Sequence, residues 1–363
     1  MMWRRNLVRE AACLCVLTPL LAAPRLAAAE GAVKYDKGFV IEDGDAFELK
    51  IGARVQTRYQ WESMDVEPER DNTQAFSIPR ARIKLDGKVF DPRLTFKYQA
   101  DFGKGFVTLK DFIINFRAMP GFELQAGQFK RPYSRHQLTS SGDLAMVDRA
   151  ITDKVLPTGR DIGFMVGSGR HGQTVEWELG LFNGTGEVPK LNAAKGTYSN
   201  VPADFVPALV MRLGYNYGKM KGYSEADLEG GPLRFAVAAN SHANLNATSD
   251  ADPTVVVGAD AALKVQGLAV LTEVHRDQDA ETTLFMAQAG YLIAEHYEPG
   301  ARFALIMPDA DGGRRQEISL GFSAYFFGHG AKWQTDFALL ETEDAAGDTT
   351  TDRLLRSQVQ LAF

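Results

Sequence analysis

Apolar and polar residues alternate almost without interruption from residue 46 to residue 61. The apolar positions are Phe47, Leu49, Ile51, Ala53, Val55, Tyr59 and Trp61. An amphipathic helix repeats its apolar positions near every 3.6 residues, so a period of two indicates a β-strand. At about 3.3 Å per residue, this strand exceeds most strands of globular proteins and is long enough to cross a bilayer at a tilt.

The last thirteen residues repeat this pattern and end on an aromatic residue. Leu355, Val359, Leu361 and Phe363 share one face of a strand, whereas Arg356, Gln358 and Gln360 point the other way. An apolar outer face and a polar inner face are typical of a closed barrel in lipid. The terminal strand resembles the signal that hands bacterial outer-membrane barrels to their assembly machinery, so we expect Phe363 to contact it. An edge strand of a soluble β-sandwich is the alternative.

The N-terminus has the features of a secretory signal peptide over residues 1–29. Three arginines precede an apolar run from residue 11 to residue 23, and small residues at 27–29 provide a cleavage site. The apolar run is too short to span a membrane as a helix. Cys13 and Cys15 both lie in this segment, so the mature chain would carry neither a disulfide nor a thiolate metal site. We assign residues 30–45 to a short periplasmic segment and 46–363 to a barrel.

Further alternating segments predict the rest of the sheet. They lie at 80–89, 93–102, 112–116, 122–126, 162–166, 175–181, 209–217, 233–239, 255–265, 268–274, 285–293, 303–307, 318–326 and 333–339. With the first and last strands, these segments predict an all-β, transmembrane antiparallel β-barrel of about 16 strands. Paired soluble sandwiches would need strands of about five or six residues and interdomain linkers, and the sequence has neither feature.

Two predicted connections are long. Residues 131–160 lack alternation and mix apolar with basic positions, as a loop folded against another surface would, and 183–206 is rich in Asn, Gly, Lys and Pro. Because a barrel of about sixteen strands encloses an aqueous lumen that its wall side chains cannot fill, we expect 131–160 to fold inward and constrict it.

Basic residues gather on the polar face of the first three strands. The predicted anion pathway consists of Arg54, Arg58, Arg80, Arg82, Lys84, Lys88, Arg93 and Lys97, with Arg131 and Arg135 at the constriction. Rings of Arg and Lys select anions by offsetting the desolvation of a negatively charged permeant. The alternative is that Asp86, Asp101 and Asp111 neutralise them. Residues 75–130 hold ten Lys and Arg against five Asp and Glu, so an excess of positive charge would survive such pairing.

Four segments resemble the phosphate-selective porin O and P family of bacterial outer-membrane proteins. They are FSIPRARIKLDGKVFDPRLTFKYQADF, GQFKRPYS, GRDIGFMVG and LGLFNGTG. The resemblance covers essentially the whole mature chain. It implies a homotrimer of sixteen-stranded barrels in the outer membrane of a Gram-negative bacterium, with basic residues guiding phosphate or related oxyanions through a water-filled channel. One departure is Pro79-Arg80-Ala81-Arg82, where the family often has one more arginine, so other anions remain open as permeants.

Other functional classes receive little support. The six histidines have no metal-ligand spacing, nucleophile-elbow and phosphate-loop motifs are absent, and the formal charge of −6 disfavours a general nucleic-acid binder. We therefore expect no cofactor, no metal and no enzymatic activity. A porin for organic acids or sugars, a barrel lipase and a closed barrel acting as an adhesin remain as alternatives.

Overall fold

The computed structural model describes residues 33–363 except 158, 188–189, 193–196, 203–204, 206, 219, 221, 246–254 and 310–312. The predicted signal peptide, residues 1–29, and part of the predicted loop 183–206 lie outside the described residues. Within them, no helix is long and apolar enough to cross a membrane.

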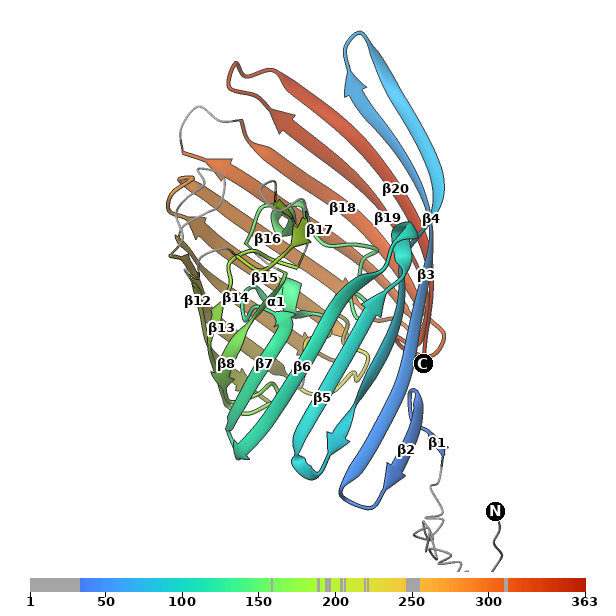
Figure 1. The fold of residues 1–363 in the computed structure, drawn as a ribbon. Coiled ribbons are helices and arrows are strands. Elements are labelled where there is room, and N and C mark those ends of the chain that lie inside the picture. The colour runs from blue at the N-terminus through green and yellow to red at the C-terminus, as the bar shows by residue number, and fades with distance from the viewer. Residues whose placement is uncertain are drawn as a thin grey trace, which may run out of the picture.

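Sixteen antiparallel strands form a closed barrel, as predicted (Figure 1). They are β3 (Phe47–Val66), β4 (Glu69–Val89), β5 (Asp91–Asp101), β6 (Thr108–Met119), β7 (Phe122–Lys130), β8 (Arg160–Gly167), β9 (Val175–Phe182), β12 (Ala208–Tyr217), β13 (Arg234–Asn244), β14 (Val255–Val265), β15 (Leu268–Asp277), β16 (Thr282–Tyr291), β17 (Tyr297–Pro308), β18 (Arg315–Tyr325), β19 (Ala331–Glu343) and β20 (Thr349–Ala362). The last strand pairs with the first from Arg353 opposite Ser63 to Ala362 opposite Arg54, which closes the sheet.

The smaller elements lie at the barrel ends or inside it. They are β1 (Lys34–Tyr35), β2 (Phe39–Asp43), β10 (Lys190–Asn192), β11 (Thr197–Ser199), the helix α1 (Arg135–Leu138) and two 3-10 turns, Gly103–Gly105 and Ile151–Lys154. β1 and β2 form a hairpin, and β2 pairs with the start of β3. The Phe39 ring lies 6.1 Å from the ring of Phe363. The described part of the predicted segment 30–45 therefore packs against the barrel wall.

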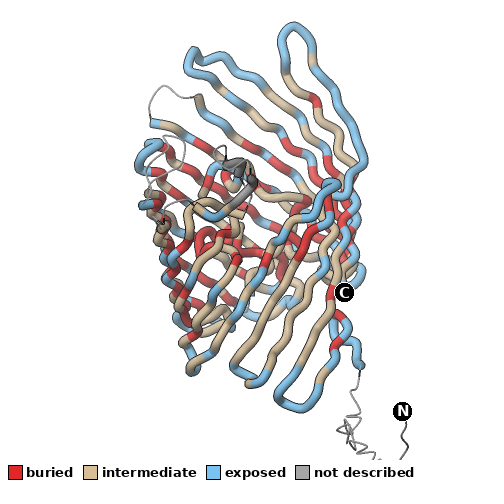
Figure 2. The backbone as a smooth tube through the Cα atoms, in the orientation of Figure 1, coloured by how far each residue is buried: buried red, intermediate tan, exposed pale blue. Residues whose placement is uncertain are grey.

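The terminal strand has the two faces that its sequence predicts. Val359 and Leu361 are 57 % and 58 % exposed on the outside, whereas Gln358 and Gln360 are buried inside at 1 % and 2 %. Outward apolar side chains bury themselves in acyl chains, and inward polar ones find partners in the lumen. Figure 2 shows buried residues along the middle of the strands and exposed residues at both rims.

The two rims differ in the length of their connections. The lower rim of Figure 1 carries short turns at residue 90 and at residues 120–121, whereas the upper rim carries longer loops. Outer-membrane barrels place short turns in the periplasm and long loops outside the cell, so we take the lower rim as periplasmic. Aromatic side chains mark this rim, where Tyr217 stacks on Phe235 at 5.2 Å between ring centroids.

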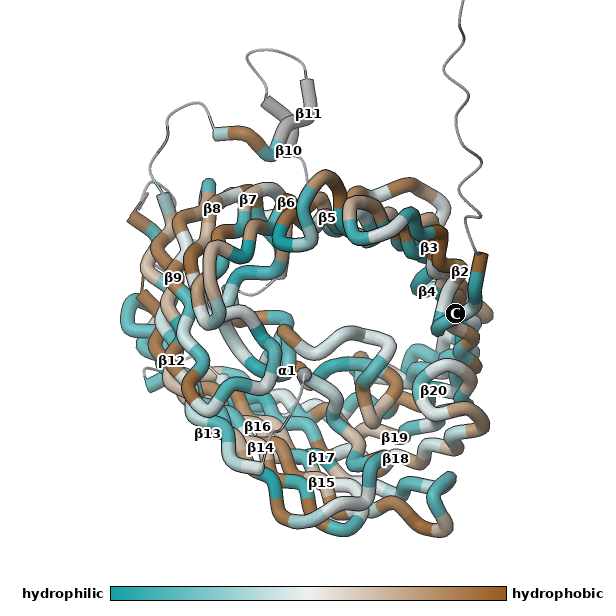
Figure 3. Tube along the Cα trace, turned by 90° about the horizontal axis from the view of Figure 1, so that it is seen from below, coloured by the Kyte–Doolittle hydropathy of each residue, from teal (hydrophilic) through white to brown (hydrophobic). Residues whose placement is uncertain are grey.

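The constriction loop (residues 131–159) folds into the barrel, as predicted, and fills one side of it (Figure 3). Its Tyr133 and Leu156 pack on inward apolar side chains of the wall. Those wall residues are Phe129, Met165, Phe182, Val210, Val256, Leu284 and Ile306. A polar inner face was expected throughout, and here that expectation is wrong, because the loop shields this wall from water.

A β-bulge in β4 sets which residues of that strand face inward. Gln56 of β3 pairs with Arg80, but Arg58 pairs with Ser77, so Ile78 and Pro79 together oppose one residue. Proline cannot donate a ladder hydrogen bond and is tolerated at such a bulge. The extra residue shifts the alternation by one, so Arg80 and Arg82 point into the barrel.

Candidate functional site

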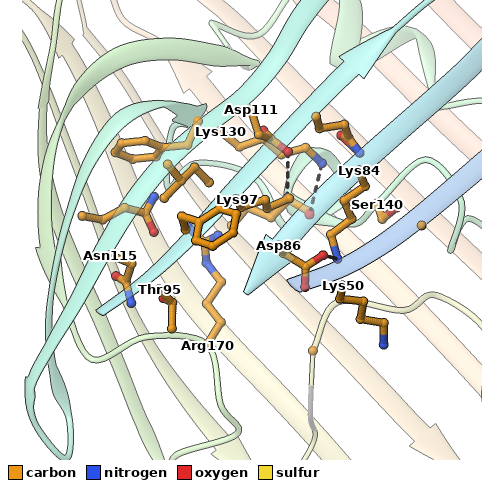
Figure 4. A pocket seen from close by; sticks show the side chains of 18 of the residues that line it. Lys50, Lys84, Asp86, Thr95, Lys97, Asp111, Asn115, Lys130, Ser140 and Arg170 are labelled. Atoms are coloured by element: carbon orange, nitrogen blue, oxygen red, sulfur yellow. Dashed lines mark hydrogen bonds and ion pairs between the residues drawn. The ribbon is translucent and has the colours of Figure 1, made fainter. Parts of the chain in front are cut away.

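A cavity of about 900 Å³ runs between the constriction loop and the wall that begins at β3. Figure 4 shows side chains from both sides converging on it, including Lys84, Lys97, Lys130 and Ser140. Nine Lys and Arg side chains line the cavity against five Asp and Glu side chains. The cavity is therefore polar and carries an excess of positive charge.

Arg54 joins the wall to the turn at residues 140–143 of the constriction loop, which we call the pore-facing turn. Its Nη1 donates to Ser140 Oγ at 3.1 Å and its Nη2 to Ser141 Oγ at 2.9 Å. Among the described residues, no carboxylate forms an ion pair with it. The hydroxyls accept from the two Nη groups without cancelling the charge, so this guanidinium keeps its positive field where the wall meets the loop.

Gly142 leaves space for that guanidinium. A Cβ added at Gly142 would lie 2.1 Å from Arg54 Nη1. We expect Gly142→Ala to fold normally but to push Arg54 off the two serines, which lowers anion selectivity in reversal-potential measurements. Gly231→Ala is the matched control, because its Cβ would meet nothing closer than 3.7 Å. Unchanged selectivity in Gly142→Ala would contradict the assignment of Arg54 to the channel.

Most other cations of the cavity are paired with carboxylates. Arg82 contacts Asp101 at 2.7 Å and Lys84 contacts Asp86 at 2.5 Å. Lys97 and Arg160 share Asp111, at 2.7 and 2.6 Å. The alternative of neutralisation by Asp86, Asp101 and Asp111 is thus correct for these residues. Because Asp111 serves two cations, the cluster still carries net positive charge.

Arg58 and Arg80 hold the constriction loop instead of lining the cavity. Both contact Asp148 of the loop, Arg58 Nη1 at 3.0 Å and Arg80 Nη2 at 3.1 Å. Their side chains are only 7 % and 13 % exposed. Burial alone would raise the pKa of Asp148, but the two guanidinium groups hold it well below its usual range. Asp148 is therefore ionised and clamps the loop to the wall.

This clamp predicts a pH dependence. An undocked aspartate titrates near pH 4, and the docked one has a lower pKa, so the docked loop is stabilised by Asp148 above about pH 4. As the pH falls below about 4, that stabilisation declines by up to about 1.4 kcal/mol per unit. Open-channel current noise should stay constant from neutral pH to about pH 5 and rise below about pH 4. A rise confined to alkaline pH would contradict the clamp.

Asp143 faces the cavity from the loop. Its carboxylate forms no hydrogen bond or ion pair with a described residue. Burial raises the pKa of this carboxyl, and Lys332 and Arg54 offset only part of the increase. The one acidic side chain on the pore-facing turn is therefore less readily ionised than a free aspartate. It consequently opposes the positive potential of the facing wall less than a free aspartate would.

The remaining four residues of the predicted anion pathway lie outside the cavity. Arg93 lies at the lower rim, 55 % exposed and paired with Asp91, and Lys88 stands opposite Glu48 near that rim. Arg131 and Arg135 do not line the cavity, which corrects their placement at the constriction. Arg131 is buried beside His242, and Arg135 is paired with Asp260 at 3.0 Å. The loop turns these two side chains toward the filled side of the barrel because buried acceptors lie there.

Sequence reasoning missed several residues of the cavity. Lys130 ends β7 and donates to three carbonyls of the constriction loop, at 2.6 to 3.2 Å. Arg170 reaches the cavity from the connection between β8 and β9 and pairs with Glu178 at 2.9 Å. Arg160, the first residue of β8, also lines the cavity. β7 continues beyond the predicted strand 122–126, so the alternation of Lys130 with Gln128 was the available signal.

Comparison with known proteins identifies the family. The profile of "Phosphate-selective porin O and P" matches residues 49–363. A search of curated proteins finds no significant match.

Solved porins share the fold at low sequence identity. The anion-selective porin from Comamonas acidovorans is 12 % identical with a TM-score of 0.60, and the alignment covers 87 % of this chain and 100 % of that one. The channel DcaP of Acinetobacter baumannii is 11 % identical with a TM-score of 0.59, covering 90 % and 99 %. The trimer form of OmpT from Vibrio cholerae is 10 % identical with a TM-score of 0.52, covering 87 % and 100 %. At this identity the likeness establishes the barrel fold.

The family match, the closed barrel and the cavity lined by charged side chains all indicate a porin. The chain is an outer-membrane porin and belongs to the phosphate-selective porin O and P family.

Proposed function

We propose that this porin forms an anion-selective channel for the passive uptake of phosphate or related oxyanions. The observation that carries the proposal is the excess of cations in the cavity, nine against five, with Arg54 unpaired by any described carboxylate. A unit charge at about 4 Å contributes between about 1 kcal/mol in water and about 4 kcal/mol near a protein surface. That range is enough to favour anions over cations by tenfold or more.

Phosphate in particular is supported by the chemistry of the cavity. Guanidinium groups present planar donors suited to phosphate oxygens, and Ser140 and Ser141 add hydroxyl donors beside Arg54. Arg54, Arg82, Lys84 and Lys97 are the predicted pathway residues that line the cavity, and we propose that they guide the permeant. The family name points to the same class of solute.

Reversal potentials of the purified protein in planar bilayers under a KCl gradient test the proposal. We expect a potential of the sign set by chloride permeation, and a cation-selective current would reject it. Added phosphate should reduce chloride current at concentrations far below that of chloride, because a phosphate site would hold the ion longer. Selective passage of chloride without phosphate block would favour the alternative of a porin for other small solutes.

We further infer that the barrel forms homotrimers in the outer membrane. The solved OmpT structure is described as a trimer form, and closed cyclic assembly is the usual arrangement of identical chains. Light scattering of the detergent-solubilised protein, corrected for bound detergent, should give three times the chain mass. A monomeric mass would contradict this inference. The fold and family favour a channel over an enzyme.

A further inference from the structure

The segment 222–233 fills the barrel from the periplasmic side. It belongs to the connection between β12 and β13, which is longer than the other connections at that rim. Instead of hanging below the rim, the segment contacts the constriction loop inside the barrel. Seen from below in Figure 3, polypeptide occupies the side of β13 to β19, and the passage lies beside β3 to β6.

Glu225 makes several polar contacts between this segment and the constriction loop. Its backbone N–H donates to the Asp143 carbonyl at 3.1 Å, and its Oε2 accepts from the Ala145 N–H at 2.9 Å. Its Oε1 lies 2.8 Å from Nδ1 of His136. Gln288 of β16 donates to the same carboxylate at 2.9 Å. One carboxylate, only 7 % exposed, therefore ties the loop to the barrel wall.

These contacts flank the pore-facing turn. His136 and Ala145 stand on either side of Ser140 and Ser141, which receive the guanidinium of Arg54. Glu225 therefore contacts the loop on both sides of the two hydroxyls, although Glu225 itself does not line the cavity.

The segment is itself anchored at several points. The carboxylate of Asp227 accepts from Gly267 N–H at 2.9 Å and also binds Arg234. The Tyr223 ring lies 4.5 Å under the guanidinium of Arg135, and its hydroxyl donates to Glu176. Burial raises the pKa of Tyr223 to about 12, so the hydroxyl keeps the proton that it donates. Segment 222–233 can therefore act as a rigid support.

We propose that segment 222–233 is a periplasmic buttress that sets the width of the constriction, with Glu225 as the positioning residue. The proposal rests on the channel function above, because its effect is read in the conducted current. The buttress prevents the constriction loop from moving down into the space below it, which keeps Ser140 and Ser141 against Arg54.

Single-channel recording of the full-length protein tests the buttress. We expect Glu225→Ala to raise conductance and to increase the time spent in wider, noisier states by on the order of tenfold. The reason is that a buried polar group left without a hydrogen-bond partner shifts a conformational equilibrium by about that factor. Glu225→Gln, which keeps one acceptor oxygen, should lie between the wild type and Glu225→Ala. Glu295→Gln is the control, because it makes the same substitution at an exposed position of the same rim, in the connection between β16 and β17.

A second variant guards against misfolding. Gln288→Leu removes the wall donor without touching the segment and should raise the noise in the same direction, and heat-modifiable migration in gels reports whether each barrel is folded. Folded Glu225→Ala and Gln288→Leu channels with wild-type conductance and noise would overturn the buttress. A wild-type protein that conducts no ions would instead reject the proposed function, so the two failures are distinguishable.

Discussion

Replacing Arg54 by glutamate should lower the permeability ratio of anions to cations by at least about tenfold, the largest change expected from any single wall residue. Arg54 lines the cavity, and hydroxyls instead of a carboxylate accept from its two Nη groups. Glutamate reverses a charge that acts within a few ångströms of the permeant, so the substitution changes the local potential by two unit charges. Reversal potentials in planar bilayers measure the ratio.

Two matched variants separate the position of the charge from its presence. Arg93→Glu makes the same change in net charge at the lower rim, where Arg93 is exposed and paired with Asp91, and it should leave the ratio nearly unchanged. Arg54→Lys retains the charge and should retain most of the selectivity. An equal loss of selectivity in Arg54→Glu and Arg93→Glu would show that net charge alone sets it, which contradicts the assigned pathway.

Removing the Asp148 carboxylate should release the constriction loop. Asp148→Ala leaves Arg58 and Arg80 as partly buried cations without their shared partner. Breaking a buried ion pair in this way costs on the order of 3 kcal/mol. We therefore expect the balance between docked and undocked loop to shift by on the order of 100-fold, with higher conductance and lower selectivity in single-channel records.

An exposed ion pair provides the control for Asp148→Ala. Asp309 pairs with Arg276 near the upper rim, where the side chain of Arg276 is 34 % exposed and that of Asp309 is 50 % exposed. Such pairs contribute about 0 to 1 kcal/mol, so Asp309→Asn should leave the current unchanged. If Asp148→Ala produced wild-type currents from a folded barrel, the constriction loop would be held by other contacts.

Lipid on one side of the wall is the reason that much of the fold was predictable. The outward face of each strand must be apolar whatever the lumen contains, so Val359 and Leu361 identify the last strand without knowledge of any partner. The polar inner face of β3 was equally clear because water or polar groups meet it. The barrel, its strand number and the inward loop followed from these local patterns.

The interior of the barrel was less predictable because its contacts join residues that are far apart in the sequence. The inward-facing residues Val210 and Val256 can be apolar because they pack in one cluster with Tyr133 and Leu156 of the constriction loop. Arg58 and Arg80 alternate onto the same face as Arg54, but Asp148 reaches them from a loop about 70 to 90 residues away. Segment 222–233 has no alternation or motif that marks it as inward. Local sequence specifies which way a side chain points and leaves open what meets it.

Cysteine accessibility tests most directly the claim that water runs along the basic wall and not through the filled side of the barrel. The sequence has cysteines only at positions 13 and 15, within the predicted signal peptide, so single cysteines can be placed at Thr95, in the cavity, and at Ser319, buried at 0 % exposure on β18. We expect a bulky cationic methanethiosulfonate to reduce the current of Thr95→Cys stepwise and to leave Ser319→Cys unchanged. Block of Ser319→Cys with Thr95→Cys unaffected would contradict the account.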